Sequence, residues 1–166
     1  CIFGILGWAV PGEGNPDAKV LFVGEAPGKN EAETGRPFIG RSGKLLRSLI
    51  HEAGLKEEEV FITSPVKYLP IRGTPLPSDI EHGKIHFDKQ VEIINPKYIV
   101  VLGSVAGVAI LGEKIQVVKR HGEIIEKDGR RIFITFHPSY ILRFQRDLQK
   151  YKEDFLKIKR LINEKN

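Results

Sequence analysis

Two carboxylates stand in a segment of the chain that is rich in glycine and proline. Glu25 and Glu31 lie within residues 24–40, directly after the apolar run 18–23. Glycines let a backbone approach a ligand with its N–H groups pointing inward, and prolines keep such a loop rigid. A carboxylate in a concave loop can position or deprotonate a water molecule. Glu25 and Glu31 are therefore candidate catalytic residues, although a structural turn with two solvated acids would give the same pattern.

A histidine marks the second candidate segment, which runs from Phe136 to Arg143 and follows another apolar run. A histidine at a strand end can donate a hydrogen bond to a carbonyl oxygen whose negative charge grows during a reaction. Ile141 and Leu142, beside a basic residue, suit insertion into a base stack next to a phosphate. In the alternative interpretation, His137 is an ordinary loop residue and both apolar side chains belong to the core.

The remaining polar residues form less specific patterns. Residues 64–77 contain four prolines together with Ser64 and Lys67, which is typical of a proline-rich connection. His82 and His86 are spaced to share one helix face and could form a metal pair, but the sequence offers no identifiable third ligand. We therefore predict no metal site.

Hydrophobic periodicity predicts the elements that must position these segments. Short apolar runs predict strands, and apolar residues at a spacing of three and four predict helices. A capping box of Ser78 and Glu81 predicts a helix start, and an Asp-Gly pair predicts a hairpin turn. The predicted strands are 18–23, 60–63 and 98–102 with a hairpin at 123–136, and the predicted helices are 41–53, 78–95, 104–111 and 148–162.

The alternation of strands and helices predicts the α/β class. We expect a three-layer α/β/α arrangement with a central, mostly parallel sheet between helices. In such folds the loops at the carboxyl ends of the strands carry the functional site. The loops after Val23, Thr63 and Phe136 are therefore expected to converge.

Composition narrows the class of protein further. The 166 residues suit a single domain over 1–166, and 26 basic against 21 acidic residues give a net charge of +5, which leans toward a polyanionic partner. The longest uncharged run, 98–112, is shorter than the roughly 20 residues of a membrane span. We expect a cytoplasmic monomer without membrane association. Few Cys, Asn and Gln with many Lys and Glu hint at a thermophile.

Five segments together resemble the uracil-DNA glycosylase superfamily, in particular its thermostable family 4. The resemblance implies a parallel four-stranded sheet between helices. It also implies hydrolysis of the N-glycosidic bond of uracil in DNA, with the base flipped out of the stack into a pocket. The segments are GEGNPDAKVLFVGEAPG at 12–28, GRPFIGRSGKLL at 35–46, VFITSPVK at 60–67, INPKYIVVLG at 94–103 and FHPSYILR at 136–143.

The resemblance also implies roles for individual residues. Phe38 would stack on the uracil ring, His137 would donate to uracil O2, and Glu25 or Glu31 would orient the attacking water. Ile141 and Leu142 would fill the gap left by the flipped nucleotide. The pocket would further be lined by Gly24, Ala26, Pro27, Gly28 and Ser64, and DNA would be contacted by Arg36, Ser139, Tyr140 and Arg143.

One departure from the family concerns the base. Ser64 stands where the family has an asparagine, whose amide offers both a donor and an acceptor to uracil O4 and N3–H. A hydroxyl satisfies only part of that edge, at a cost of roughly 1–3 kcal/mol. We therefore expect action on uracil or another deaminated base. The alternatives are a degenerate relative that binds DNA without excision, and an enzyme of small phosphorylated molecules, whose P-loop lysine pattern is absent from the sequence.

The other departure concerns a cofactor. The family holds a four-iron cluster with four cysteines, whereas this sequence has one cysteine, Cys1, near the second expected position. Tyr68 stands at the third position, and Gly83 or its neighbour His82 at the fourth. We predict that no cluster and no other cofactor is present, and that packing, with Tyr68, holds the proline-rich loop.

Overall fold

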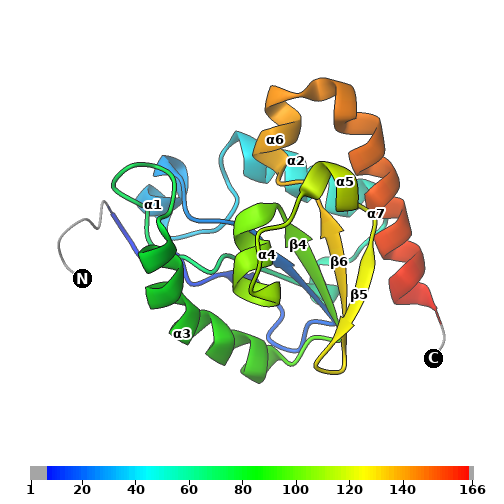
Figure 1. Ribbon diagram of the computed structural model, residues 1–166, viewed down its shortest axis with the longest axis horizontal. Helices are drawn as coiled ribbons and strands as arrows, with labels where there is room; N and C mark the ends of the chain where they lie inside the picture. The colour runs from blue at the N-terminus through cyan, green and yellow to red at the C-terminus, as the bar shows by residue number, and fades with distance from the viewer. Residues whose placement is uncertain (1–6, 165–166) are drawn as a thin grey trace.

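A six-stranded sheet forms the centre of the computed structural model, which describes residues 7–164 (Figure 1). Its strand order is β1-β3-β2-β4-β6-β5, and the four central strands are parallel. The expected four-stranded parallel sheet is thus confirmed, with an antiparallel strand added at each edge. The strands are β1 (Glu13–Gly14), β2 (Val20–Val23), β3 (Val60–Thr63), β4 (Tyr98–Leu102), β5 (Ile124–Lys127) and β6 (Arg130–Thr135).

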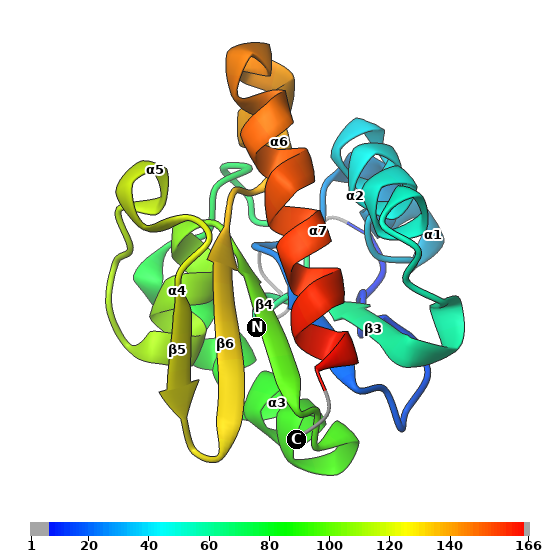
Figure 2. The ribbon, with the colours of Figure 1, turned by 90° about the vertical axis from the view of Figure 1, so that its right-hand side faces the viewer.

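Helices cover both faces of the sheet, as the α/β/α prediction requires (Figure 2). Helices α2 and α7 pack on one face, and α3 and α4 pack on the other. Among residues 7–164 no helix is long and apolar enough to cross a membrane. The helices are α1 (Lys29–Thr34), α2 (Arg41–Glu52), α3 (Pro77–Ile94), α4 (Ser104–Leu111), α5 (Val117–Arg120), α6 (Pro138–Arg143) and α7 (Leu148–Asn163), with 3-10 turns at Glu57–Glu59 and Gln145–Asp147.

Strand β2 shows how the core is divided between the two faces. Its four residues are fully buried, because a central parallel strand is covered on both sides. Val20 and Phe22 point into the core with α2 and α7, whereas Leu21 and Val23 point into the core with α3 and α4. The ring of Phe22 stacks on that of Phe155 at a centroid distance of 6.0 Å. The sheet therefore holds the ends of its strands, and the loops that follow them, in fixed positions.

The predicted start of α3 needs a correction. The helix begins at Pro77, with Leu76 as its N-cap, and the Asp79 carboxylate accepts the Leu76 N–H at 2.7 Å. Proline suits the first helical position because it has no N–H to satisfy. The helix therefore starts one residue earlier than predicted, and Asp79 instead of Glu81 becomes the residue that caps it.

The predicted hairpin is confirmed, and three short helices, α1, α5 and α6, were not predicted. Asp128 and Gly129 both have positive φ, 52° and 74°, as a two-residue hairpin turn with matching twist requires. Helix α1 lies inside the segment that the sequence indicated only as a glycine- and proline-rich loop. It has six residues, which is too short for a helical periodicity to stand out.

Candidate active site

A cavity of about 140 Å³ lies where the loops after β2, β3 and β6 meet. The convergence predicted for these three loops is therefore confirmed. The first loop contributes Glu31 and Phe38, the second Ser64 and the third His137. The full lining is Val10, Ala26, Pro27, Gly28, Glu31, Pro37, Phe38, Ser42, Ser64 and His137.

Phe38 forms an aromatic wall of this cavity and has an unusual backbone conformation. Its φ is +49°, although it is not a glycine, and its ring centroid lies 6.0 Å from that of His137. Two glycines make room for it. A Cβ at Gly24 would lie 2.3 Å from the Phe38 Cζ, and a Cβ at Gly43 would lie 1.9 Å from the Phe38 carbonyl carbon. A flat apolar wall of this kind suits a planar ring.

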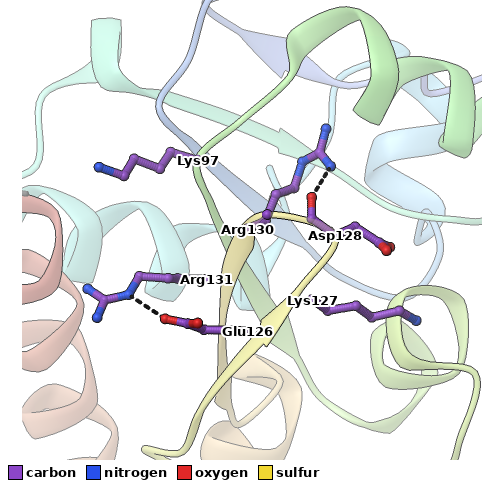
Figure 3. Close-up of a pocket in the computed structure, with 7 residues that line it drawn as sticks. Lys97, Glu126, Lys127, Asp128, Arg130 and Arg131 are labelled. Carbon is purple, nitrogen blue, oxygen red and sulfur yellow. Dashed lines mark hydrogen bonds and ion pairs between the residues drawn. The ribbon is translucent and has the colours of Figure 1, made fainter.

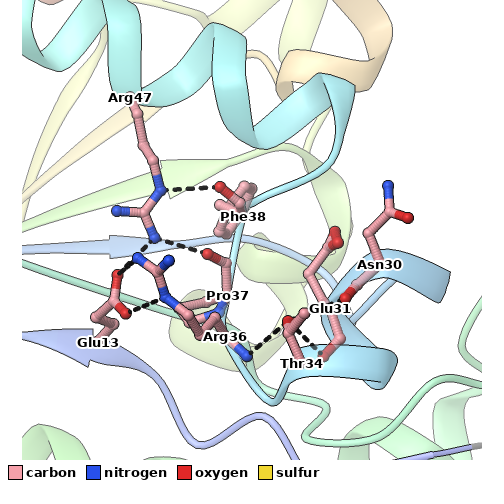
Figure 4. Close-up of polar contacts among 8 residues, drawn as sticks. All are labelled: Glu13, Asn30, Glu31, Thr34, Arg36, Pro37, Phe38 and Arg47. Atoms are coloured by element: carbon pink, nitrogen blue, oxygen red, sulfur yellow. Dashed lines mark hydrogen bonds and ion pairs between the residues drawn. The ribbon is translucent and has the colours of Figure 1, made fainter.

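An arginine and a glutamate hold the Phe38 segment in place (Figure 4). Arg47 donates from Nε to the Phe38 carbonyl at 2.9 Å, and from Nη2 to the Pro37 carbonyl at 2.7 Å and to Glu13 at 2.8 Å. Arg36 donates to both oxygens of the same carboxylate, and this bonding lowers the pKa of Glu13. Arg36 thus braces the loop beside the cavity, and its contact with DNA stays a prediction.

His137 is held as a neutral hydrogen-bond donor. Its Nδ1 lies 3.1 Å from the Ser139 backbone nitrogen, whose N–H can only donate, so Nδ1 is the acceptor. The proton of the neutral ring is then on Nε2. Burial lowers the pKa of His137 to about 4, so the ring is uncharged at neutral pH. Ser139 therefore fixes the tautomer, and Nε2–H is available to a ligand.

The two candidate acids occupy different positions. Glu31 lines the cavity, and its Oε2 is buried without a hydrogen-bond partner among residues 7–164. Gly28 and Gly40 leave room for this carboxylate, because a Cβ at either position would lie within 3.5 Å of it. Glu25 is not among the lining residues, and burial raises its pKa. A buried carboxylate oxygen without a hydrogen bond is costly. Of the two candidate acids, Glu31 is therefore the one whose position in the cavity calls for a functional explanation.

Helix α6 corrects one predicted DNA contact. Ile141 is 1% exposed and packs in the core with Tyr151, so the prediction that it inserts into DNA is wrong for this structure. The next residue, Leu142, points away from that core and is half-buried. Arg143 is exposed. Tyr140 stacks on Phe136 at 5.2 Å and donates to Asp147, which makes it a brace of the fold.

A larger cavity elsewhere in the structure lacks the features of a site. It has about 430 Å³ and lies at the β5–β6 hairpin, at the amino ends of β4 and β6. Its basic side chains point in different directions (Figure 3). Arg131 pairs with Glu126 at 3.6 Å, and Arg130 donates to the Asp128 carbonyl. Because these cations diverge, they do not form a common binding surface for an anion.

The residues that sequence reasoning missed act through their tertiary position. Arg47 lies on an amphipathic helix, where the pattern indicates a solvated residue. Val10 belongs to an uncharged stretch without a motif, and Ser42 is the second residue of α2. Gly43 lies in the motif GRPFIGRSGKLL, but the motif does not explain why glycine is needed there. The structure does, because a Cβ at Gly43 would lie 1.9 Å from the Phe38 carbonyl carbon.

The fold and the cavity define a class of protein. It is an α/β protein with a small site at the carboxyl ends of parallel strands, built from an aromatic wall, a neutral imidazole donor and a carboxylate. The sequence model of the uracil DNA glycosylase superfamily matches residues 11–160, and the chain belongs to this superfamily.

Three relatives named type-4 uracil-DNA glycosylase show how similar the chain is to family 4. It is 44% identical to the one from Thermotoga maritima over 81% of this chain and 71% of the relative. It is 42% identical to the one from Sulfurisphaera tokodaii over 92% of this chain and 74% of the relative. It is 34% identical to the one from Archaeoglobus fulgidus over 94% of this chain and 83% of the relative. The resemblance noted from the motifs is thereby confirmed.

The residues present do not fit the iron–sulfur cluster that this type implies. The sequence has one cysteine, Cys1, which lies outside the described residues. Tyr68 is exposed, and a Cβ at Gly83 would lie 2.2 Å from the Pro65 carbonyl oxygen, so α3 is too close to the loop there for a cysteine. Residues 7–164 also contain no group of three or more His, Cys, Asp or Glu that could hold a metal ion.

Proposed function

We propose that the protein hydrolyses the N-glycosidic bond of uracil, or of another deaminated base, in DNA. Superfamily membership and the similarity to the type-4 relatives support this reaction. Inside a duplex the bond is out of reach, so the base must be flipped into the cavity. The cavity is small and has one aromatic wall, which suits a single pyrimidine ring.

Glu31 is the residue to which we assign the attacking water. Two observations support this assignment: Glu31 lines the cavity, and its Oε2 is buried without a hydrogen-bond partner among residues 7–164. The water oxygen forms a bond to C1′ while the bond from C1′ to the base breaks and its electron pair leaves with the base. Glu31 takes the proton of the water. Glu25, outside the cavity lining, contributes through its loop backbone.

His137 is assigned to the leaving group. The departing base collects negative charge on its O2 oxygen, and an Nε2–H donor lowers the energy of that charge. A low pKa suits this task, because the ring donates a hydrogen bond without carrying a proton that the base would take up. Phe38 stacks on the base, Ser64 faces part of its polar edge, and the loop backbone from Gly24 to Gly28 contacts the rest.

The DNA is held outside the cavity by α6 and its neighbours. Leu142 fills the gap left by the flipped nucleotide, and Ser139 and Arg143, both exposed, contact phosphates. The net charge of +5 favours a polyanion. We further propose that residues 1–166 form a single domain that acts as a cytoplasmic monomer without a cofactor.

One assay tests the reaction and its alternatives. The protein is incubated with single- and double-stranded oligonucleotides that carry one uracil, hypoxanthine or xanthine, and abasic sites are then cleaved with alkali. Strand breaks at uracil are expected, and breaks at a purine alone would change the assigned base. Glu31→Gln should remove most of the activity while Glu33→Gln, an exposed neighbour on α1, should not. Binding without breaks at any base would contradict the proposal.

A further inference from the structure

The proposed reaction makes no use of Lys67, a buried lysine beside the site. It is 7% exposed and lies in the loop that follows β3. Its Nζ donates to Thr63 Oγ1 at 2.7 Å, to Gln90 Oε1 at 2.5 Å and to the Pro11 carbonyl at 3.3 Å. Three acceptors thus match the three donors of an ammonium group. Because all three hydrogens of its ammonium group are bonded within the protein, Lys67 links the segments to which the three acceptors belong.

These partners come from separate parts of the chain. Pro11 is in the segment before β1, Thr63 ends β3, and Gln90 lies on α3. The partners also bond one another, since Thr63 Oγ1 lies 3.0 Å from the Pro11 carbonyl and Gln90 Nε2 donates to the same carbonyl. The Lys67 carbonyl accepts the Val10 N–H at 2.7 Å. We call Lys67, Thr63, Gln90 and Pro11 the Lys67 node.

The node is joined directly to two walls of the cavity. Val10 precedes Pro11 and Ser64 follows Thr63 in the chain, and both line the cavity. The backbone positions of Val10 and Ser64 are therefore set by the residues that Lys67 binds. The node also ties together the N-terminal segment, the proline-rich loop and α3.

An amino group is a costly choice for a buried side chain at this position. Within residues 7–164 the contacts of the ammonium group are its three acceptors and the Phe87 ring, whose centroid lies 5.6 Å from Nζ, and none of them is a carboxylate. Burial lowers the pKa of Lys67 to about 7. Burying a charge without an opposite charge costs free energy, and an apolar side chain of similar size avoids that cost. What Lys67 supplies at this position is a directed set of hydrogen bonds to three separate parts of the chain.

We propose that Lys67 is a positioning residue whose ammonium group holds Val10 and Ser64 at the spacing that the flipped base requires. The inference rests on the proposed excision reaction and concerns the same cavity. Lys67 does not touch the base or the reacting atoms. It acts through Pro11 and Thr63, so its loss should alter the rate of excision more than the binding of DNA.

The test compares Lys67→Met with Lys89→Met, which removes an exposed lysine from α3. In Lys67→Met, the single-turnover rate of uracil excision should fall at least tenfold. Affinity for undamaged DNA should stay within twofold, and the unfolding temperature should be unchanged or higher. Lys89→Met should match the wild type in all three. An unchanged excision rate in Lys67→Met would overturn the proposal. A lower excision rate that is accompanied by a lower unfolding temperature would overturn it as well, because the loss would then follow from destabilisation.

A second readout depends on pH. The partners of Nζ are a hydroxyl, an amide and a carbonyl, and none of them titrates in this range. Above pH 7 the neutral amine keeps only two hydrogens for three acceptors, so the wild-type excision rate should decline from pH 7 to 9. The Lys67→Met rate should be low and should lack this decline. Parallel profiles of the two proteins would contradict the inference.

A third measurement separates this inference from the reaction itself. Amide hydrogen exchange at Val10 should be at least tenfold faster in Lys67→Met than in Lys89→Met, and Gln90→Met should give an intermediate value. These comparisons hold even if the wild type excises no base, in which case the proposed function alone fails. Unchanged exchange at Val10 in both node variants would show that the node does not position the wall.

Discussion

His137 combines two features that decide what it can do for a leaving base. Its Nδ1 is occupied by the Ser139 N–H, and its burial keeps the ring neutral. Loss of one donor to a developing anion typically lowers kcat by about 10²–10³-fold. His137→Ala should therefore reduce single-turnover excision by that factor while DNA affinity changes little. His51→Ala, at an exposed position on α2, is the control and should excise uracil at the wild-type rate.

The low pKa of His137 also predicts how stability depends on pH. In the unfolded chain the histidine has its ordinary pKa of about 6.5, whereas in the folded protein the pKa is about 4. Between these values the unfolded state binds more protons, so the free energy of unfolding falls as pH decreases from 6.5 to 4. Urea titrations at several pH values should show this extra loss in the wild type and not in His137→Gln. If the free energy of unfolding fell equally in both proteins, the low pKa of His137 would be refuted.

In the proposed reaction, Ser64 meets part of the polar edge of the base. One hydroxyl can satisfy a donor or an acceptor of the base edge, whereas an amide satisfies both. Ser64→Asn should therefore raise uracil excision by about ten- to a hundredfold, the equivalent of one restored partner. The measurement is the ratio of excision rates for uracil and hypoxanthine in otherwise identical oligonucleotides. A lower uracil rate in the variant would mean that other groups recognise this edge.

At the scale of elements, helix α2 and the Phe38 segment depend on each other. Gly43 lies inside the helix, where alanine normally stabilises by up to about 1 kcal/mol. Here a Cβ would lie 1.9 Å from the Phe38 carbonyl carbon, so the backbone must move. Gly43→Ala should lower the unfolding temperature by several degrees and weaken excision, whereas Ser48→Ala, at an exposed site on the same helix, should do neither. A more stable Gly43→Ala variant would show that the segment adapts.

The elements also show which parts of the fold can be predicted from sequence. Strands 60–63 and 98–102 and helix 104–111 match the structure, because glycine or proline bounds each apolar run. Strand β1 has two residues and exists through its pairing with β3, so no local pattern reveals it. The start of α3 was misplaced because proline at the first position moved the cap to Asp79.

The candidate site also has a part that can be predicted from the sequence and a part that cannot. Phe38, Ser64 and His137 follow strands or stand in motifs, and the sequence predicted that they meet. Ile141 could not be assigned, because its apolar neighbour Leu142 has the same local pattern and only the packing of α6 decides which of them is buried. The clamp of Arg47 on the Phe38 segment depends on a distance between elements, which no spacing along the chain encodes.

The whole molecule has to hold its N-terminal segment, its proline-rich loop and α3 together. The type-4 resemblance implies a cluster for this purpose, but Tyr68 and Gly83 stand at two of its ligand positions. In this structure the contact of Gly83 with Pro65 and the Lys67 node join the same segments. Hydrogen bonds and packing can therefore provide the connection that metal ligation would otherwise supply.

This view predicts the metal content and the response to chelation. Protein purified without oxygen should contain far less than four irons per chain and lack the visible absorbance of a cluster, because two ligand positions carry no cysteine. Its unfolding temperature and its excision rate should be the same before and after incubation with a strong iron chelator. A type-4 relative that holds its cluster serves as the control and should lose stability under that treatment. Stoichiometric iron in this protein would mean that other side chains complete the site, and the Lys67 node would then share its task with a metal.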